Sequence, residues 1–546
     1  MEWLNEENRR RLTQLGSAVV RGFQAYNESQ QNVNRQTQPS QNELAFVQPN
    51  TSVNEDSESL YVEFSREHIL VRTPLAIDKP RTSDGYTPLI CAVNRNSLNS
   101  TVLLLSNGAS VNATDLKGNT ALHHAINKKN VLIVKILLIF RADFTIKNKI
   151  GKAAICLETS PEVTEILLKC KLWKEQKLVE NSTIINSIQT KMEIHKQQIA
   201  LQYQLNKSLE DKKRSLRLLS LDGGGIRGLV LIQILMELEE LSEAFNENFV
   251  LKNFDWIAGT STGAILALAL ANGFSPIKCL RLYLRLKDDI FSRGRPYSEE
   301  KFEEFLKANL GENRKMANIN KKLKVFVTAT KADQIPIKLI LFRSYDSPFK
   351  ESAEFLPQNA NIWKAARCSS AAPTYFKSVN GIMDGGLMAN NPGVTLLLEV
   401  FKHIDIQALS GGNDKIELPE LAFMLSLGTG KCPEVPISIT DVSLQSGVQG
   451  LIQTVTALTN LKSILVEQLS TSDGQVVELA RYMSHTRRAP YFRFTPELNI
   501  DVQLDTVDNN LLVEMLWTTK EYIREKCSID VVSLLELFSE FNKARE

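Results

Sequence analysis

Residues 254–270 have the sequence FDWIAGTSTGAILALAL, in which two apolar runs flank Gly259-Thr260-Ser261-Thr262-Gly263. A G-x-S-x-G pattern between such runs predicts a strand, a sharp turn and a helix, with Ser261 at the apex of the turn. The glycines on both sides lack the Cβ atoms that so tight a turn would bring into collision, and the free amides at the start of the helix face the serine. We therefore predict that residues 259–263 form a nucleophile elbow, in which Ser261 is the activated nucleophile. The alternative is an ordinary Gly/Ser-rich loop.

A second glycine-rich stretch, DGGGIRG (residues 222–228), follows the apolar run Leu218–Leu221 and precedes the amphipathic run Leu229–Leu241. Backbone amides in a turn between a strand and a helix can hold the phosphate of a nucleotide such as NAD(P) or ATP. They can equally stabilise the oxyanion of an acyl-transfer reaction. Because acyl transfer by Ser261 requires an oxyanion hole, we favour the second use. We assign to the oxyanion hole Gly223, Gly224, Gly225, Arg227 and Gly228.

A serine hydroxyl also needs a group that accepts its proton. Only two histidines follow the elbow, His403 in a segment predicted to be helical and His485 in an arginine-rich segment, and neither has a catalytic motif around it. Asp384 is the better candidate, because GIMDGG (residues 381–386) predicts a short strand that ends in a turn at Gly385 and Gly386. A carboxylate there would lie at the edge of the sheet where α/β sites gather. A simple turn aspartate is the alternative.

Upstream of this region the chain repeats itself. DGYTPLICA (residues 84–92) is echoed by KGNTALHHA (residues 117–125), and Gly85, Gly118 and Gly151 recur with a period of 33 residues. This pattern resembles the ankyrin repeat, with two clear repeats and a degenerate third that ends near Trp173. His123 and His124 occupy consensus positions, so we expect them to be structural rather than metal ligands. Ankyrin stacks bind proteins, which implies a protein partner.

Composition sets the limits of the prediction. The 546 residues carry a net charge of +2, which gives no reason to expect a nucleic acid partner. Seven cysteines without a CxxC pair fit a reducing compartment and argue against a zinc site. There is no apolar run of membrane-spanning length and no secretory signal at the start. We expect a soluble, cytoplasmic protein that meets lipid only by peripheral association with a membrane.

The chain divides into four predicted parts. Residues 1–58 are polar and predicted to be largely disordered. Residues 59–173 hold the repeats, and 174–214 form a charged helical linker. Residues 215–546 form an α/β domain with a helical C-terminal extension. Apolar runs at 324–330, 339–342 and 421–428 are of strand length and suit a mostly parallel sheet covered on both faces.

Three stretches, DGGGIRG, GTSTG and the DGG at 384–386, occur in this order and resemble the patatin-like phospholipase family. LFRSYDSP (341–348), AAPTYF (371–376) and DGGLMANNP (384–392) strengthen the likeness. With ankyrin repeats ahead of the domain, the chain resembles the ankyrin-bearing group VI calcium-independent phospholipase A2 branch. One departure is that this chain has fewer recognisable repeats.

The resemblance implies a patatin-like three-layer domain, preceded by a short all-α ankyrin-repeat domain. It implies a Ser261–Asp384 dyad without histidine that cleaves fatty-acyl esters of glycerophospholipids through an acyl-enzyme, with no metal or cofactor. Arg227 is then a candidate to bind the lipid phosphate, with a solvated arginine as the equal alternative. The alternatives are a lysophospholipid, acyl-CoA or triacylglycerol hydrolase, or an ankyrin adaptor with an inactive hydrolase-like domain.

A broad apolar stripe runs along residues 444–469. We expect this stripe to belong to the core, and the alternatives are a homodimer interface, a calmodulin-type target or a face that inserts into a phospholipid bilayer. The resemblance modestly favours the calmodulin and dimer alternatives. Basic residues at 292–297 and at Arg487–Arg488 could meet anionic headgroups, although solvated surface is the more common role of such residues.

Overall fold

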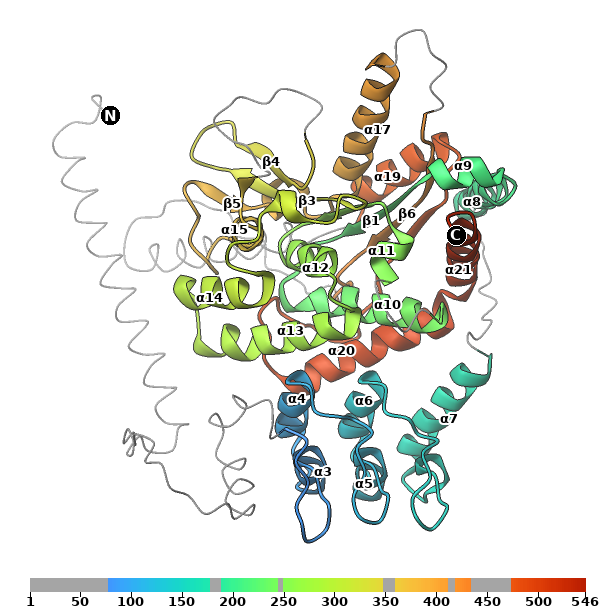
Figure 1. Ribbon diagram of the computed structural model, residues 1–546, viewed down its shortest axis with the longest axis vertical. Helices are drawn as coiled ribbons and strands as arrows, with labels where there is room; N and C mark the ends of the chain where they lie inside the picture. Colours follow the sequence, from blue (N-terminus) through green and yellow to red (C-terminus); the bar gives the residue numbers. More distant parts are fainter. Residues whose placement is uncertain (1–76, 177–187, 244–248, 347–358, 411–417, 434–472) are drawn as a thin grey trace, which may run out of the picture. The chain divides into compact units, whose positions relative to one another are not determined.

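A computed structural model of the chain describes residues 77–176, 188–243, 249–346, 359–410, 418–433 and 473–546 (Figure 1). All of them belong to one compact unit, Ser57–Glu546. The predicted disordered segment 1–58 and the apolar stripe at 444–469 lie outside the described residues.

The N-terminal part of the described chain is a stack of helix pairs. Its turns use Gly85, Gly118 and Gly151, whose φ angles of +74°, +75° and +79° favour glycine at the same place in each repeat. The third repeat is reduced, because its first helix is a single short turn. The elements are α3 (Pro88–Asn94), α4 (Leu98–Ser106), α5 (Ala121–Lys128), α6 (Val131–Ile139), η1 (Ala154–Cys156) and α7 (Pro161–Gln176).

The two histidines of the second repeat serve the repeat itself. The His123 ring accepts from the backbone amide of Thr120, while the Thr120 hydroxyl caps the start of α5. His124 contacts Asp115, with 2.9 Å between Nε2 and Oδ2. The carboxylate of Asp115 also accepts the amides of Lys117 and Asn119, so it holds the turn between the repeats.

A seven-stranded sheet forms the centre of the second part, with the order β4-β3-β2-β1-β6-β7 and β5 paired to β3. The pairs among β3, β2, β1, β6 and β7 are all parallel, whereas β4 and β5 run antiparallel to β3. This confirms the prediction of a mostly parallel sheet. The strands are β1 (Leu216–Leu221), β2 (Trp256–Gly259), β3 (Lys324–Lys331), β4 (Lys338–Arg343), β5 (Ile382–Asp384), β6 (Leu421–Leu427) and β7 (Tyr491–Phe494).

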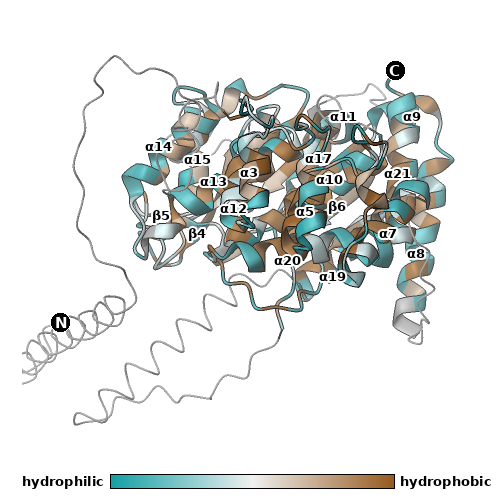
Figure 2. Ribbon diagram, turned by 90° about the horizontal axis from the view of Figure 1, so that it is seen from below, coloured by the Kyte–Doolittle hydropathy of each residue, from teal (hydrophilic) through white to brown (hydrophobic). Residues whose placement is uncertain are grey.

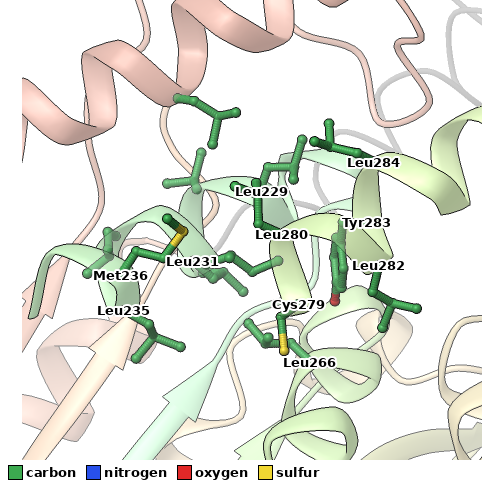
Figure 3. Close-up of a cluster of buried hydrophobic side chains, with 14 of the residues drawn as sticks. Leu229, Leu231, Leu235, Met236, Leu266, Cys279, Leu280, Leu282, Tyr283 and Leu284 are labelled. Carbon is green, nitrogen blue, oxygen red and sulfur yellow. The ribbon is translucent and has the colours of Figure 1, made fainter. Parts of the chain in front are cut away.

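The sheet is covered on both faces, which gives the three layers expected from the sequence. Alternate residues of a strand point to opposite faces, so Leu219 and Ile257 join the larger apolar cluster, while Leu218 and Ala258 join a smaller one. The larger cluster includes α10 (Gly228–Leu241), α12 (Thr262–Ala271) and α13 (Pro276–Asp289). Figure 3 shows part of it, where leucines of α10 and α12 meet Tyr283 of α13. The smaller cluster includes α17 (Gly393–Ser410) and α19 (Gln475–Thr486).

The remaining helices surround these layers. The hydropathy colouring in Figure 2 is brown along α12 and β6, which lie inside, and largely teal on outer helices such as α14. These remaining helices are α8 (Ile188–Leu205), α9 (Leu209–Arg214), η2 (Gly225–Arg227), α11 (Phe249–Asn253), η3 (Phe291–Arg293), α14 (Glu299–Leu310), η4 (Met316–Asn318), α15 (Ile362–Ser369), α16 (Gly386–Ala389), α20 (Asn509–Glu521), η6 (Tyr522–Lys526) and α21 (Ser528–Lys543). No described helix is long and apolar enough to cross a membrane.

The second helix of each repeat packs on the α/β domain. Lys135 of α6 makes an ion pair with Glu514 of α20 at 2.8 Å, and Trp173 of α7 packs on Trp517 with ring centroids 5.8 Å apart. Arg141, which follows α6, pairs with the buried Glu239 of α10 at 2.7 Å. One side of the ankyrin stack is therefore covered by helices of the α/β domain.

Candidate active site

The predicted elbow has a strained backbone at its serine. β2 ends at Gly259 and α12 begins at Thr262, which leaves Ser261 with φ +54° and ψ −121°. A positive φ is uncommon outside glycine and marks a strained site. A Cβ at Gly259 would lie 2.4 Å from the carbonyl oxygen of Gly263, and one at Gly263 would lie 2.3 Å from that of Leu221. The turn therefore requires glycine at both positions.

The two threonines of the elbow have different surroundings. Thr260 is fully buried, and its hydroxyl lies 2.7 Å from that of Thr328 on β3 and donates to the carbonyl of Ala389. Thr262 starts α12 and lines the cavity described below. Its carbonyl accepts the hydroxyl of Tyr283.

Ser261 and Asp384 meet directly. The Ser261 Oγ donates to Asp384 Oδ2 at 2.7 Å, although the residues are 123 positions apart in the chain. The other carboxylate oxygen, Oδ1, accepts the amide of Gly386 at 2.7 Å. That second bond fixes the orientation of the carboxylate, so that Oδ2 faces the serine.

The pairing of β5 explains how these distant residues come together. β4 covers one edge of β3, so β2 and β5 share the other. β2 ends where Gly259 pairs with Val327, and β5, running the opposite way, ends where Asp384 pairs with Ala329. The two strand ends therefore meet head to head across Thr328. Gly385 must lack a side chain there, since a Cβ would lie 2.1 Å from the Thr328 hydroxyl oxygen.

The environment of Asp384 makes the carboxyl group harder to ionise than that of an exposed aspartate. Burial raises the pKa of the carboxyl to about 6, against the lowering effect of its hydrogen bonds with the Gly386 amide and the Ser261 hydroxyl. A carboxylate with such a pKa is a better proton acceptor than an exposed aspartate and is still ionised at neutral pH.

The triple-glycine loop lies beside the elbow, because β1 and β2 are parallel neighbours in which Leu221 pairs with Gly259. The amide of Gly223 donates to the carbonyl of Asn390 at 3.1 Å, so it is already used. Among the described residues no acceptor is present for the amides of Gly224 and Gly225, and both residues line the same cavity as Ser261. Of the five residues predicted for an oxyanion hole, Gly224 and Gly225 are therefore the two whose amides could donate to a group in the cavity.

Arg227 and Gly228 do not fit the roles that the sequence suggested. Arg227 is buried, does not line the cavity, and donates through Nη1 to Cys432 Sγ at 2.9 Å, so it is not presented to a lipid phosphate. Gly228 starts α10, where a Cβ would lie 2.7 Å from the ring of Tyr283. Its role is the close packing of α10 on α13.

A cavity of about 740 Å³ opens above the serine. Its wall combines the polar groups just described with a larger set of aliphatic and aromatic side chains. The lining residues are Gly224, Gly225, Ser261, Thr262, Ile265, Leu286, Phe291, Phe302, Ser370, Ala372, Pro373, Tyr375, Phe376, Asp384, Gly386, Leu387, Asn390 and Leu504. Such a wall can hold an apolar chain next to a nucleophile.

Two family models match parts of this chain. Residues 219–396 match the family model of patatin-like phospholipase, and residues 66–148 match that of ankyrin repeats in three copies. The chain carries a patatin-like phospholipase domain preceded by ankyrin repeats.

Three curated relatives have similar sequences. The 85/88 kDa calcium-independent phospholipase A2 of Mus musculus is 40% identical over 330 residues, which cover 58% of this chain and 40% of the relative. The intracellular phospholipase A2 of Caenorhabditis elegans is 29% identical over 79% of this chain and 38% of its own length. The calcium-independent phospholipase A2-gamma of Homo sapiens is 30% identical over 57% and 38%. The chain therefore spans about two fifths of the length of these relatives.

Neither histidine that follows the elbow lines the cavity. His403 on α17 packs edge-on against Trp256 and Tyr345, and burial lowers its pKa to about 4. His485 on α19 contacts Gln197 at 3.0 Å, and burial lowers its pKa to about 4 as well. Within the described residues, no cluster of three or more His, Cys, Asp or Glu side chains is arranged to hold a metal ion.

The basic residues predicted to meet headgroups are partly engaged within the protein. Arg295 makes a bidentate pair with Asp505, at 2.6 Å for each bond, and stacks on Tyr375. Arg487 and Arg488 lie over the rings of Phe401 and Tyr203. Aromatic and carboxylate partners of the chain itself therefore orient these guanidinium groups.

Sequence reasoning missed three residues that shape the site. The buried Ser369 accepts the amide of Ser261 on its Oγ at 2.9 Å and the amide of Gly385 on its carbonyl at 3.2 Å. Thr429 donates to the carbonyl of Gly223, and Leu504 accepts the amide of Ile226. Ser369 lies two residues before the recognised run 371–376 and could have been suspected, whereas no pattern marks Thr429 or Leu504.

Proposed function

We propose that this protein is a calcium-independent phospholipase A2-type acyl hydrolase that cleaves fatty-acyl esters of glycerophospholipids with a Ser261–Asp384 dyad. The observation that carries the proposal is the 2.7 Å hydrogen bond from Ser261 Oγ to Asp384 Oδ2 in the wall of an apolar cavity. The strained backbone at Ser261 and the raised pKa of Asp384 support it, since both are typical of catalytic groups.

The proposed reaction uses groups that surround this pair. Asp384 accepts the hydroxyl proton while Ser261 Oγ attacks the ester carbonyl carbon, and the amides of Gly224 and Gly225 stabilise the resulting oxyanion. Collapse of the tetrahedral intermediate breaks the bond to the leaving alcohol, which takes the proton from Asp384 and departs as a lysophospholipid. Water, deprotonated by the same carboxylate, then hydrolyses the acyl-enzyme to the free fatty acid.

The substrate class rests on the cavity and on the relatives. Aromatic rings of Phe291, Phe302 and Phe376 line the space beyond Ser261, which suits a fatty-acyl chain. The relatives named above are phospholipases A2. In this proposal the protein works in the cytoplasm at the surface of a phospholipid bilayer, and its ankyrin repeats bind a protein partner.

The test compares three proteins on phosphatidylcholine vesicles in the presence of a calcium chelator. Ser261→Ala and Asp384→Asn should each lower the release of fatty acid by about four orders of magnitude, because the members of a catalytic unit act together. Ser484→Ala is a matched control, since this serine is also buried but donates to Ala480 within α19. Retained activity in Asp384→Asn would assign the base to another group.

A second measurement separates the remaining alternatives. A fluorophosphonate probe should label the wild-type protein at Ser261 and leave Ser261→Ala unlabelled. An unlabelled wild-type protein would favour the ankyrin adaptor with an inactive domain. Activity confined to lysophospholipid, acyl-CoA or triacylglycerol in a substrate panel would keep the dyad and change the substrate.

A further inference from the structure

The hairpin between β3 and β4 exposes apolar side chains at its tip. Ile335 is 99% exposed and Ile337 is 40% exposed, in a segment of only six residues between the two strands. The short helix α16 adds Met388, which is 45% exposed. Single exposed apolar residues are common on protein surfaces, but a group of them at one protruding edge indicates contact with an apolar partner.

The hairpin extends from the same edge of the sheet as the active site. Val327 of β3 is level with Gly259, the last residue of β2 before the elbow. β3 continues for four further residues to Lys331, or about 13 Å at the usual rise of a strand. The tip at Ile335 lies beyond that point, so it projects past the elbow at the edge where Ser261 and the glycine loop lie.

The base of the hairpin is also connected to the segment that leads into the cavity wall. The base of the hairpin is tied to the segment before Asp384, because the amide of Ala332 donates to the carbonyl of Gly381 at 2.9 Å. On the other side of Asp384, Gly386 and Leu387 line the cavity, and Met388 follows them on α16. α16 itself contacts β3 and β4. The hairpin base, Asp384 and α16 therefore lie along the same part of β3, next to the cavity.

The charges around this surface suit a lipid interface. Lys331 and Lys338 are paired opposite each other at the base of the hairpin, and Lys338 is exposed. No carboxylate pairs with either lysine among the described residues, and the nearest acid in the hairpin is Asp333. Apolar side chains at a tip with lysines behind them match the depth profile of a membrane surface, where acyl chains lie beneath anionic headgroups.

We propose that the hairpin tip with Ile335 and Ile337, together with Met388 of α16, inserts into the interfacial region of a phospholipid bilayer, and that Lys331 and Lys338 contact anionic headgroups. Insertion holds the mouth of the cavity against the membrane, so that a phospholipid enters without crossing water. This rests on the proposed function for the identity of the lipid, while binding itself can be measured without catalysis.

The binding test uses the full chain with Ser261→Ala as background, so that lipid is not consumed. Co-sedimentation is measured with vesicles of phosphatidylcholine that contain a minor share of phosphatidylglycerol. Adding Ile335→Asp and Ile337→Asp should weaken binding at least about tenfold, because each substitution removes the burial of one large aliphatic side chain. Ile335→Trp should strengthen binding, since tryptophan favours the interface. Lys331→Gln with Lys338→Gln should reduce the gain that phosphatidylglycerol gives.

Two matched controls carry the same substitution elsewhere. Ile150 in the ankyrin repeats is 76% exposed and Ile529 in α21 is 74% exposed. Ile150→Asp and Ile529→Asp should leave vesicle binding unchanged. Equal weakening by the control and hairpin variants, or no weakening by the hairpin variants, would overturn the proposal. The proposal would also be overturned if the hairpin variants changed the sedimentation coefficient of the protein in the absence of lipid. That result would show that the tip contacts a second copy of the chain.

The catalytic test uses otherwise unaltered protein and two substrates, phospholipid vesicles and a water-soluble short-chain ester. Ile335→Asp with Ile337→Asp should lower the ratio of vesicle hydrolysis to ester hydrolysis by about tenfold or more. A fall of both activities with the ratio unchanged would contradict the proposal. If wild-type protein cleaves neither substrate but still binds vesicles through the tip, the proposed function fails and the membrane surface remains.

Discussion

Two glycine-rich turns follow neighbouring parallel strands, and different parts of the chain crowd them. In the elbow after β2, the space that a Cβ would need at Gly259 or Gly263 is filled by backbone atoms of the elbow itself and of the adjacent end of β1. In the loop after β1, the space at Gly224 is filled by Thr429 and that at Gly225 by Leu504. These two residues come from the segments that follow β6 and β7.

The difference shows how independently each turn can form. The backbone path of the elbow at its two glycines depends only on the pairing of β1 with β2, because the close contacts of Gly259 and Gly263 lie within that pair. The glycine loop takes its shape from segments on the other side of β1, so it is complete only when β6 and β7 have joined the sheet. The nucleophile is thus held by local geometry, and the proposed oxyanion donors are held by long-range packing.

The largest expected effect on stability is that of Gly263→Ala in the elbow. Its Cβ would lie 2.3 Å and 2.5 Å from the carbonyl oxygens of Leu221 and Asp222, which cannot move without separating β1 from β2. We expect a loss of about 3 kcal/mol or more in the free energy of unfolding, measured by urea denaturation. An unchanged unfolding midpoint would show that the elbow is less tightly constrained than its contacts indicate.

Gly224→Ala should damage activity more than stability. The added Cβ would meet the side chain of Thr429, 2.3 Å from its Oγ1, and a side chain can move where a backbone cannot. We expect the protein to fold and the rate of ester hydrolysis to fall by about 10²–10³-fold, as when one oxyanion donor is misplaced. Adding Thr429→Gly should restore part of the rate. Without such a rescue, Thr429 would not be what positions the loop.

The pH dependence of activity and stability tests the role of Asp384, the last residue of β5, which lies next to the elbow. Because the pKa of Asp384 is raised to about 6, kcat/KM should fall tenfold per pH unit below about 6 and be level above it. The pKa of Asp384 is higher in the folded than in the unfolded protein. Its favourable contribution to the free energy of unfolding is therefore fully present below about pH 4 and is lost as the pH rises through 6.

Asp384→Asn should therefore raise the free energy of unfolding at neutral pH by about 2–3 kcal/mol at most. The same substitution should abolish activity. The exposed Asp333→Asn is the control and should change neither. A destabilised Asp384→Asn would mean that the carboxylate contributes more through its hydrogen bonds to Ser261 and Gly386 than its burial costs.

The smallest effect is expected for Ser369→Ala, which removes the acceptor of the Ser261 amide. The strained turn should then hold its serine less firmly, so we expect kcat to fall about tenfold and KM to change little, in line with the loss of one positioning hydrogen bond. Ser369→Thr keeps the hydroxyl and should recover part of kcat. A rise in KM alone would assign Ser369 to substrate binding.

The sequence predicted the parts of the site that depend on neighbouring residues. The flanks of Ser261 are enough to predict the elbow, and GIMDGG is enough to predict a short strand that ends at Asp384. The sequence did not reveal that β5 runs antiparallel to β3, or that its end meets β2 across Thr328, because strand pairing between distant segments leaves no local pattern. The placement of Arg227 against Cys432 was missed for the same reason.

The head-to-head meeting of β2 and β5 has a consequence for how this site tolerates change in chain length. Strand residues alternate between faces, so deleting or inserting one residue between Val327 and Ala329 would turn the Asp384 side chain to the opposite face of the sheet. A shift by two residues would restore the face but move the carboxylate about 7 Å along β3. Substitutions nearby leave this spacing intact, whereas an indel in the middle of β3 removes the proton acceptor without touching either member of the pair.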